Sequence, residues 1–99
     1  MATEIGIDLG TSKTVIFSSS RIVLEQPSIV TVDSETWDPI YYGEKAKKTL
    51  GRTPDSMICV SPIEHGVIAD YDITELMLKE YMHRAFGNKI VRPKIIASL

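Results

Sequence analysis

The chain is short of the features that mark several large classes of protein. It has one cysteine, Cys59, among 99 residues, which excludes an internal disulfide framework and favours a reducing compartment such as the cytoplasm. Its 13 acidic and 11 basic residues leave a net charge of -2, so no overall field recruits nucleic acid. No apolar run approaches the roughly 20 residues that span a bilayer, and no basic segment followed by an apolar run marks a signal peptide.

Residues that commonly build metal or catalytic sites are also scarce. The two histidines, His65 and His83, and the single Cys59 show no metal-ligand spacing. His65 follows Glu64 in a loop between proline and glycine, but neighbouring side chains in such a loop rarely project to one point, and no nucleophile accompanies them. We therefore assign no catalytic residue.

What the chain does have is an apolar content of 43% and a charged content of 24%, typical of one modest globular domain. Strand patterns occur at residues 4–9, 14–19, 22–24, 28–32, 40–42, 57–60 and 67–68. A short helix is expected at 44–50. A long helix is expected at about 73–86, with Asp72 and Glu75 as its capping box and Gly87 as its end. This order of elements predicts mixed α/β layers.

Residues 94–99 have the pattern of a buried strand, and the sequence stops inside it. A strand at a terminus with no turn after it is expected of a truncated or excised piece of a longer protein. Its open edge could pair with a second copy of the chain.

The most informative stretch is residues 4–14. Apolar side chains alternate with Gly6 and Asp8, so the apolar set is expected to enter the core and to leave the Gly6/Asp8 face open to a ligand. The turn that follows consists of Gly10, Thr11, Ser12 and Lys13. Its backbone N–H groups, its hydroxyls and its ammonium can together surround a phosphate, and Asp8 could hold a hydrated cation beside it.

Each of these assignments has a plainer alternative. The turn could be a hairpin that only needs a flexible glycine. Asp8 could be an ordinary carboxylate at a strand end, and an exposed lysine such as Lys13 is common in turns. Because a DLGT segment alone is a weak signal, the phosphate interpretation also depends on segments further along the chain.

Those segments are QPSIV at residues 26–30, GEKA at 43–46 and SPIEHGVIAD at 61–70. In this order and spacing the chain resembles the actin superfamily, and most closely its bacterial MreB type. The resemblance covers nearly all of the chain. It implies an α/β, actin-like ATPase (ribonuclease H-like) fold that is incomplete here, with a mixed sheet, one long helix and a small α/β subdomain. Residues 1–33 and 67–99 would be part of subdomain IA with the first phosphate-binding hairpin, and 34–66 would be the small subdomain IB.

The resemblance also implies a ligand set. In this family ATP and Mg²⁺ lie between two domains. Gly10, Thr11, Ser12 and Lys13 would surround the β- and γ-phosphates, and Asp8 would lie near the water-coordinated Mg²⁺. MreB proteins usually carry Ala-Asn where this chain has Ser12-Lys13, and a lysine in this turn is more like eukaryotic actin or FtsA.

For the full-length protein the resemblance implies self-association into filaments, work with the cell-wall synthesis machinery, and control of rod cell shape. Relatives carry a membrane-inserting loop near residues 88–93. Here Ile90 and Val91, flanked by basic residues, would suit an anionic lipid surface at the inner face of the membrane. Alternatively, both begin the next strand and are buried.

Two other functions stay open from the sequence. One is a different actin-superfamily ATPase, of the FtsA or heat-shock chaperone type. The other is a non-enzymatic interaction fragment that modulates filaments. The second phosphate hairpin and the adenosine-binding segment of the family would both follow Leu99, so we expect the 99 residues alone not to hydrolyse ATP.

Overall fold

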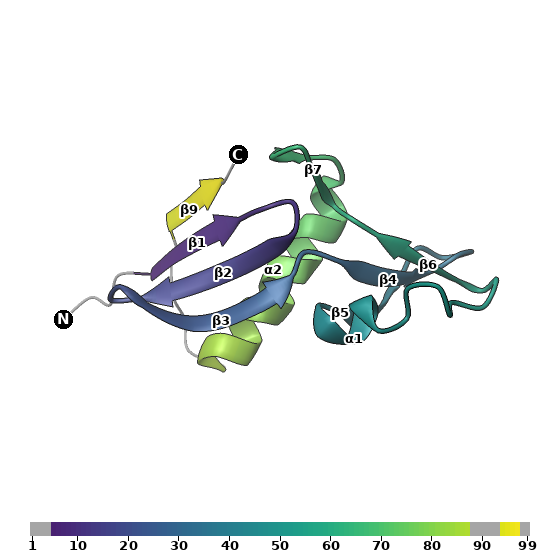
Figure 1. The fold of residues 1–99 in the computed structure, drawn as a ribbon, viewed down its shortest axis with the longest axis horizontal. Coiled ribbons are helices and arrows are strands. Elements are labelled where there is room, and N and C mark those ends of the chain that lie inside the picture. Colours follow the sequence, from purple (N-terminus) through teal and green to yellow (C-terminus); the bar gives the residue numbers. More distant parts are fainter. Residues whose placement is uncertain (1–4, 88–93, 98–99) are drawn as a thin grey trace.

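The computed structural model describes residues 5–87 and 94–97. These form a four-stranded sheet covered by a long helix, a three-stranded sheet with a short helix, and a two-stranded hairpin. Figure 1 shows the larger sheet and the long helix at one end of the molecule and the smaller sheet at the other. The mixed α/β architecture predicted from the sequence is confirmed.

The larger sheet contains β1 (Ile5–Leu9), β2 (Lys13–Ser18), β3 (Arg21–Pro27) and β9 (Lys94–Ala97), in the order β3-β2-β1-β9. The first three strands are antiparallel neighbours, whereas β9 runs parallel to β1. β3 extends to Pro27, three residues beyond the predicted strand end at residue 24. Proline is tolerated there because β3 is an edge strand and Pro27 is its last residue.

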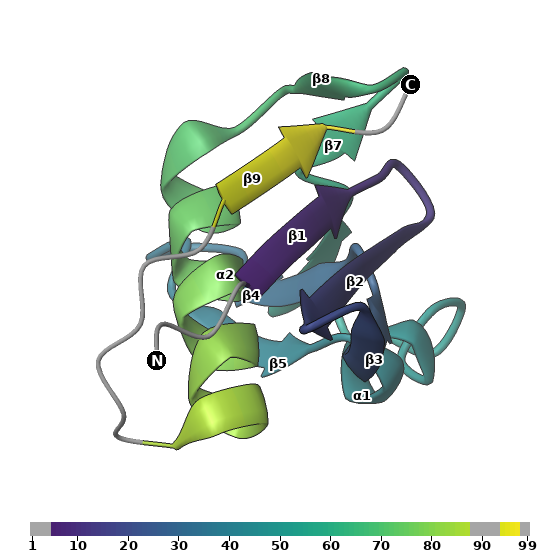
Figure 2. The same ribbon diagram turned by 90° about the vertical axis from the view of Figure 1, so that its left-hand side faces the viewer.

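One face of this sheet packs on α2 (Tyr71–Phe86), which crosses behind β2 and β3 in Figure 1 and stands to the left of the strands in Figure 2. The core cluster consists of Ile5, Ile7, Leu9, Ile16, Val30, Val32, Ile63, Ile73, Met77 and Tyr81. Its three α2 members are spaced by four residues and therefore form one stripe on the helix. Gly6 and Asp8 alternate with the buried residues of β1 and stay half-buried on the opposite face, as the alternation predicts.

The N-terminus of α2 differs from the prediction. Its N-cap is Asp70, whose Oδ1 accepts a hydrogen bond from the Ile73 N–H at 3.0 Å, so the predicted capping box of Asp72 and Glu75 is wrong. Asp70 Oδ2 also accepts from Trp37 Nε1 at 3.4 Å, a contact from outside the helix that the local sequence could not reveal. The predicted end at Gly87 is confirmed, with a φ of 65° that suits glycine.

The smaller sheet contains β4 (Val30–Asp33), β5 (Pro39–Tyr42) and β6 (Met57–Val60), all antiparallel, with β4 in the centre. Val30 and Val32 of β4 are fully buried in the core cluster that the larger sheet and α2 also line. The two sheets are therefore joined by shared apolar packing and not only by the chain that connects them.

Helix α1 (Glu44–Lys47) is shorter than the predicted 44–50. The Thr49 hydroxyl donates to the Ala46 carbonyl at 2.7 Å, and the Thr49 N–H donates to the same oxygen at 3.0 Å. An α-helix that continued would use this carbonyl for the N–H of Leu50, which instead donates to Lys47. The segment therefore tightens into turns after its first helical residues.

The remaining strands, β7 (Ile63–Glu64) and β8 (Val67–Ile68), form a hairpin where the sequence predicted a loop followed by a strand. Its two central residues, His65 and Gly66, have φ values of 53° and 75°, as a type I′ turn requires. Within the described ranges, no helix is both long and apolar enough to cross a membrane. Ile90 and Val91, for which the sequence leaves open a membrane contact or burial in the next strand, lie outside the described residues.

Candidate functional site

The turn between β1 and β2 is closed on itself and anchored by the chain that follows β3. The Gly10 N–H donates to the Lys13 carbonyl at 3.0 Å, and the Ser12 carbonyl accepts from the Ser28 N–H at 3.0 Å. The buried hydroxyls of Thr14 and Ser28 are 2.8 Å apart and hydrogen-bonded. Ser28 therefore holds the turn through both its backbone and its side chain.

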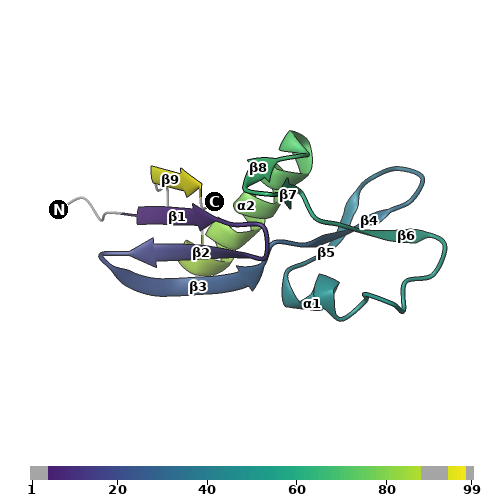
Figure 3. The ribbon, with the colours of Figure 1, turned by 45° about the horizontal axis from the view of Figure 1, so that its top comes forward.

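A second anchor comes from the β7–β8 hairpin, which lies beside the turn in Figure 3. Thr11 Oγ1 accepts a hydrogen bond from the Gly66 N–H at 3.0 Å. Sequence reasoning singled out the segments that contain Ser28 and Gly66 but assigned neither residue to the site. The one signal in the sequence that links Ser28 and Gly66 to the site is that their segments occur together with the turn motif.

The anchored turn keeps open hydrogen-bond donors. Thr11, Ser12 and Lys13 are all exposed. Within residues 5–87 and 94–97, the backbone N–H groups of Thr11 and Ser12 donate to no other residue. Successive free N–H groups in a fixed turn form a concavity that attracts anions, because the amides are already oriented before the ligand arrives. This arrangement can bind a phosphate or a carboxylate.

Asp8 lies on the open face of the sheet next to this turn. Asp8 is half-buried. Its Oδ1 is enclosed but accepts no hydrogen bond from the described residues. An enclosed carboxylate oxygen without a partner is costly, so a water molecule or a cation is its natural partner. No group of three or more His, Cys, Asp or Glu residues that could hold a metal occurs in the described part of the chain. Asp8 therefore fits a cation that keeps most of its water, as Mg²⁺ does.

Lys13 does not extend over the turn. Its Nζ lies 2.8 Å from Glu25 Oε1 on the neighbouring strand β3, and the two side chains are 63% and 48% exposed. The hydrogen bond to Glu25 and the charge of Glu25 raise the pKa of Lys13 above its ordinary value, and Asp8 adds a smaller effect. The ammonium is therefore charged and engaged by Glu25.

Beside the turn is a hollow of about 310 Å³. It is lined by Ser12, Lys13, Glu25, Gln26, Pro27, Glu44 and Lys47. These residues come from the turn, from β3 and from α1, so the hollow lies between the edge of the larger sheet and α1. Its lining carries two lysines and two glutamates, and their charges balance.

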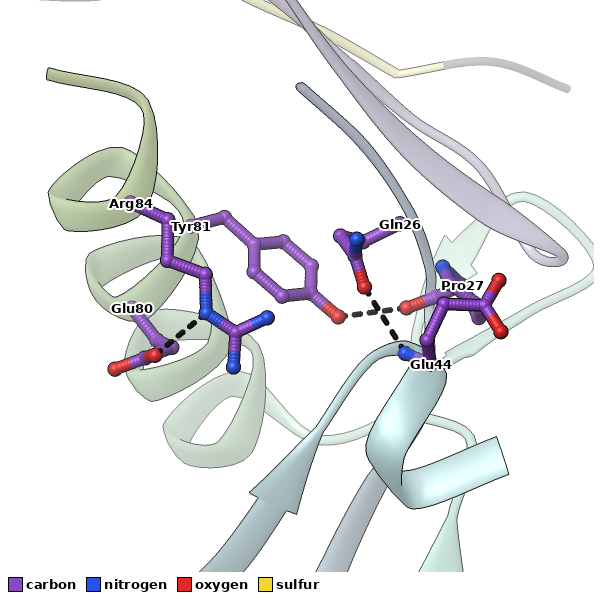
Figure 4. A network of polar contacts seen from close by, with 6 residues as sticks. All are labelled: Gln26, Pro27, Glu44, Glu80, Tyr81 and Arg84. Atoms are coloured by element: carbon purple, nitrogen blue, oxygen red, sulfur yellow. Dashed lines mark hydrogen bonds and ion pairs between the residues drawn. The ribbon is translucent and has the colours of Figure 1, made fainter. Parts of the chain in front are cut away.

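Next to this hollow, residues 26–30 (QPSIV) and 43–46 (GEKA) meet through the network drawn in Figure 4. Gln26 Oε1 accepts from the Glu44 N–H at 2.9 Å, and the Tyr81 hydroxyl donates to the Pro27 carbonyl at 2.7 Å. Burial raises the pKa of Tyr81, so its hydroxyl stays protonated and able to donate. Gly43, with a φ of 67°, packs against the side chains of Gln26 and Tyr81. This network joins α2, β3 and α1.

The β1–β2 hairpin keeps open donors at the end of a mixed sheet. One long helix backs this sheet, and a small sheet follows it. Together these features define part of an actin-like ATPase domain. Two solved structures share this fold. MreB 5 of Spiroplasma citri bound to AMPPNP is 25% identical with a TM-score of 0.83, covering 96% of this chain and 30% of that one. MreB5 of Spiroplasma citri bound to ADP is 26% identical with a TM-score of 0.82, covering 96% of this chain and 29% of that one.

The chain belongs to the MreB/Mbl protein family, whose profile matches residues 2–99. The cell shape-determining protein Mbl of Bacillus cereus is 43% identical over 84 residues, covering 84% of this chain and 25% of that protein. The cell shape-determining protein MreB of Escherichia coli K12 is 36% identical over 97 residues, covering 93% of this chain and 28% of that protein. The chain thus spans about a quarter of the length of these relatives. The resemblance and the fold class predicted from the sequence are confirmed.

Proposed function

We propose that this chain forms one wall of the nucleotide site of an MreB/Mbl-type cell shape protein, and that the β1–β2 turn binds the β- and γ-phosphates of ATP. The observation that carries the proposal is the turn itself. It is held by Ser28 on one side and Gly66 on the other, while the donors of Thr11 and Ser12 stay free. The nucleotides bound by the two Spiroplasma citri relatives support it.

Within this proposal the residues have separate roles. Gly10 shapes the turn, and the N–H groups of Thr11 and Ser12 donate to phosphate oxygens. Since Thr11 Oγ1 already accepts from Gly66, its own proton is available for an anion. Lys13, which is paired with Glu25, contributes positive charge near the turn without contacting the phosphates directly. Asp8 would hold Mg²⁺ through water with its unpartnered Oδ1, and the bound ion would neutralise phosphate charge.

The division into subdomains is part of the same proposal. Subdomain IA would consist of the larger sheet, α2 and the phosphate hairpin, and the smaller IB would contain β4, β5, β6 and α1. Because β4 pairs with β5 and β6, sheet membership supports a first boundary between Pro27 and Val30, slightly before residue 33. The return to IA near residue 67 follows β6.

For the complete gene product we propose the role in cell shape that the names of its relatives state, together with the activities that the family resemblance implies. It would bind ATP, associate with itself into filaments in the cytoplasm at the inner face of the membrane, act with the cell-wall synthesis machinery and determine cell shape. The membrane contact through Ile90 and Val91 is part of this proposal. The family assignment supports the role in cell shape.

The central test is a double substitution in the turn. Changing Thr11→Ala together with Lys13→Ala in the complete gene product should weaken ADP binding about tenfold to a hundredfold, because a hydroxyl donor and a nearby charge are lost. Calorimetric titration at fixed Mg²⁺ measures the change. The matched control is Thr36→Ala with Lys79→Ala, which removes the same side chains away from the turn.

Circular dichroism checks that both variants remain folded. Equal ADP affinity in the turn variant and the parent would contradict the phosphate assignment. The same loss of affinity in the control pair would show that the effect is not local to the turn.

A further prediction concerns the 99 residues alone. They should show no ATP turnover, because phosphoryl transfer needs positioning and charge stabilisation from several sides and this chain supplies one. A phosphate-release assay on the purified chain measures this. Turnover that co-purifies with the chain and disappears in Asp8→Ala would show the prediction to be wrong.

A further inference from the structure

The open face of the larger sheet places one lysine between two carboxylates. Asp8 on β1 is directly opposite Val15 on β2, and Val15 is directly opposite Glu25 on β3. Residues opposite each other share a face, and so do residues two apart along a strand. Lys13 is two residues before Val15, so Asp8, Lys13 and Glu25 all lie on the face away from α2.

The two carboxylates are engaged differently. Lys13 Nζ lies 2.8 Å from Glu25 Oε1, whereas Asp8 Oδ1 has no hydrogen-bond partner among the described residues. Asp8 is the other carboxylate whose charge acts on Lys13. An ammonium and a hydrated divalent cation carry the same sign, so they compete for one carboxylate oxygen. Because Lys13 is paired with Glu25, its ammonium does not occupy the Asp8 carboxylate.

We propose that Glu25 is a positioning residue, which holds the Lys13 ammonium away from Asp8 and from the phosphate position and so leaves Asp8 to a hydrated Mg²⁺. The inference rests on the proposed phosphate site. Its consequence is that nucleotide binding relies on the divalent cation. A Lys13 freed from Glu25 would contact the phosphates directly and would reduce that reliance.

The experiment measures how ADP affinity depends on Mg²⁺. Glu25→Gln keeps the shape of the side chain and removes its charge, so it frees Lys13. In the complete gene product, calorimetric titration with EDTA in place of Mg²⁺ should show ADP bound about tenfold more tightly by Glu25→Gln than by the parent. With excess Mg²⁺ the two affinities should differ by less than about threefold, because the cation then neutralises the phosphates in both proteins.

Two further variants separate this role from a general effect of charge. Lys13→Met combined with Glu25→Gln should remove the gain, because the freed ammonium is absent. Glu75→Gln is the matched control. It breaks a Lys79–Glu75 pair on α2 at 3.1 Å with 71% and 66% exposure, and it should leave the ratio of the two affinities unchanged. If Glu25→Gln does not fold, Glu25→Thr makes the same test with a residue that suits a strand.

The outcomes distinguish the two proposals. A parent that binds no ADP under either condition would overturn the proposed phosphate site, and this inference with it. A parent that binds ADP, with an unchanged ratio in Glu25→Gln, would overturn the positioning role alone. An equal change in Glu75→Gln would also overturn it, because the effect would then follow from net charge.

Discussion

Replacing Gly43 by alanine should lower the free energy of unfolding by about 3 kcal/mol, the combined cost of a strained backbone and an overfilled site. Gly43 has a φ of 67°, a backbone conformation that residues with a side chain rarely adopt. A Cβ built there would overlap Gln26 Oε1 and lie 2.8 Å from the Tyr81 hydroxyl oxygen. Both atoms are hydrogen-bonded, so neither can move away without losing a partner.

Urea unfolding followed by circular dichroism measures the loss. Gly51→Ala is the matched control, since Gly51 has a φ of 77° but no heavy atom within 4 Å of a built Cβ. It should lose only the backbone strain, about 1 kcal/mol. Equal losses in the two variants would mean that the Gln26–Tyr81 contact does not restrict this position.

Replacing Tyr81 by phenylalanine should lower the free energy of unfolding by about 2 kcal/mol, because the Pro27 carbonyl loses its donor inside the protein. The Tyr81 side chain is fully buried, and its hydroxyl is 2.7 Å from that carbonyl oxygen. Tyr71→Phe is the control. Tyr71 is 73% exposed, so its hydroxyl can bind water in both states and the loss should be below about 0.5 kcal/mol.

The stability that the Tyr81–Pro27 hydrogen bond provides depends on pH. Burial raises the pKa of Tyr81 above its ordinary value of 10.0. The neutral hydroxyl therefore stabilises the fold fully below pH 10 and less as the pH rises beyond it. Urea unfolding at alkaline pH should show the difference between parent and Tyr81→Phe shrinking. A constant difference would contradict the role of the protonated hydroxyl.

Much of the fold was predictable because it follows from local pattern. The alternation along residues 5–9 identifies both the buried face of β1 and the face that carries Asp8. The apolar stripe of α2 and the glycine after it define the long helix. The errors occur where side chains compete. Asp70 instead of Asp72 caps α2, and Thr49 ends α1 by taking a carbonyl that a longer helix would use.

The candidate site was predictable in its composition but not in its contacts. The turn residues could be named from a short motif. Its anchors could not, because Ser28 is 14 residues from Thr14 and Gly66 is 55 residues from Thr11. No pattern in the sequence marked Glu25 as part of the site. Its pairing with Lys13 depends on the register between β2 and β3, which no local pattern specifies.

By itself the sequence determined the strand and helix pattern, the chemistry of the β1–β2 turn and, through its ordered segments, the MreB/Mbl family. Only the tertiary structure decided that the turn is held from two sides, that Lys13 is engaged by Glu25, and that Asp8 keeps an unpartnered oxygen. The reason is physical. Periodicity and turn chemistry act over a few neighbouring residues, whereas these contacts join distant residues whose meeting depends on strand register and on a shared core.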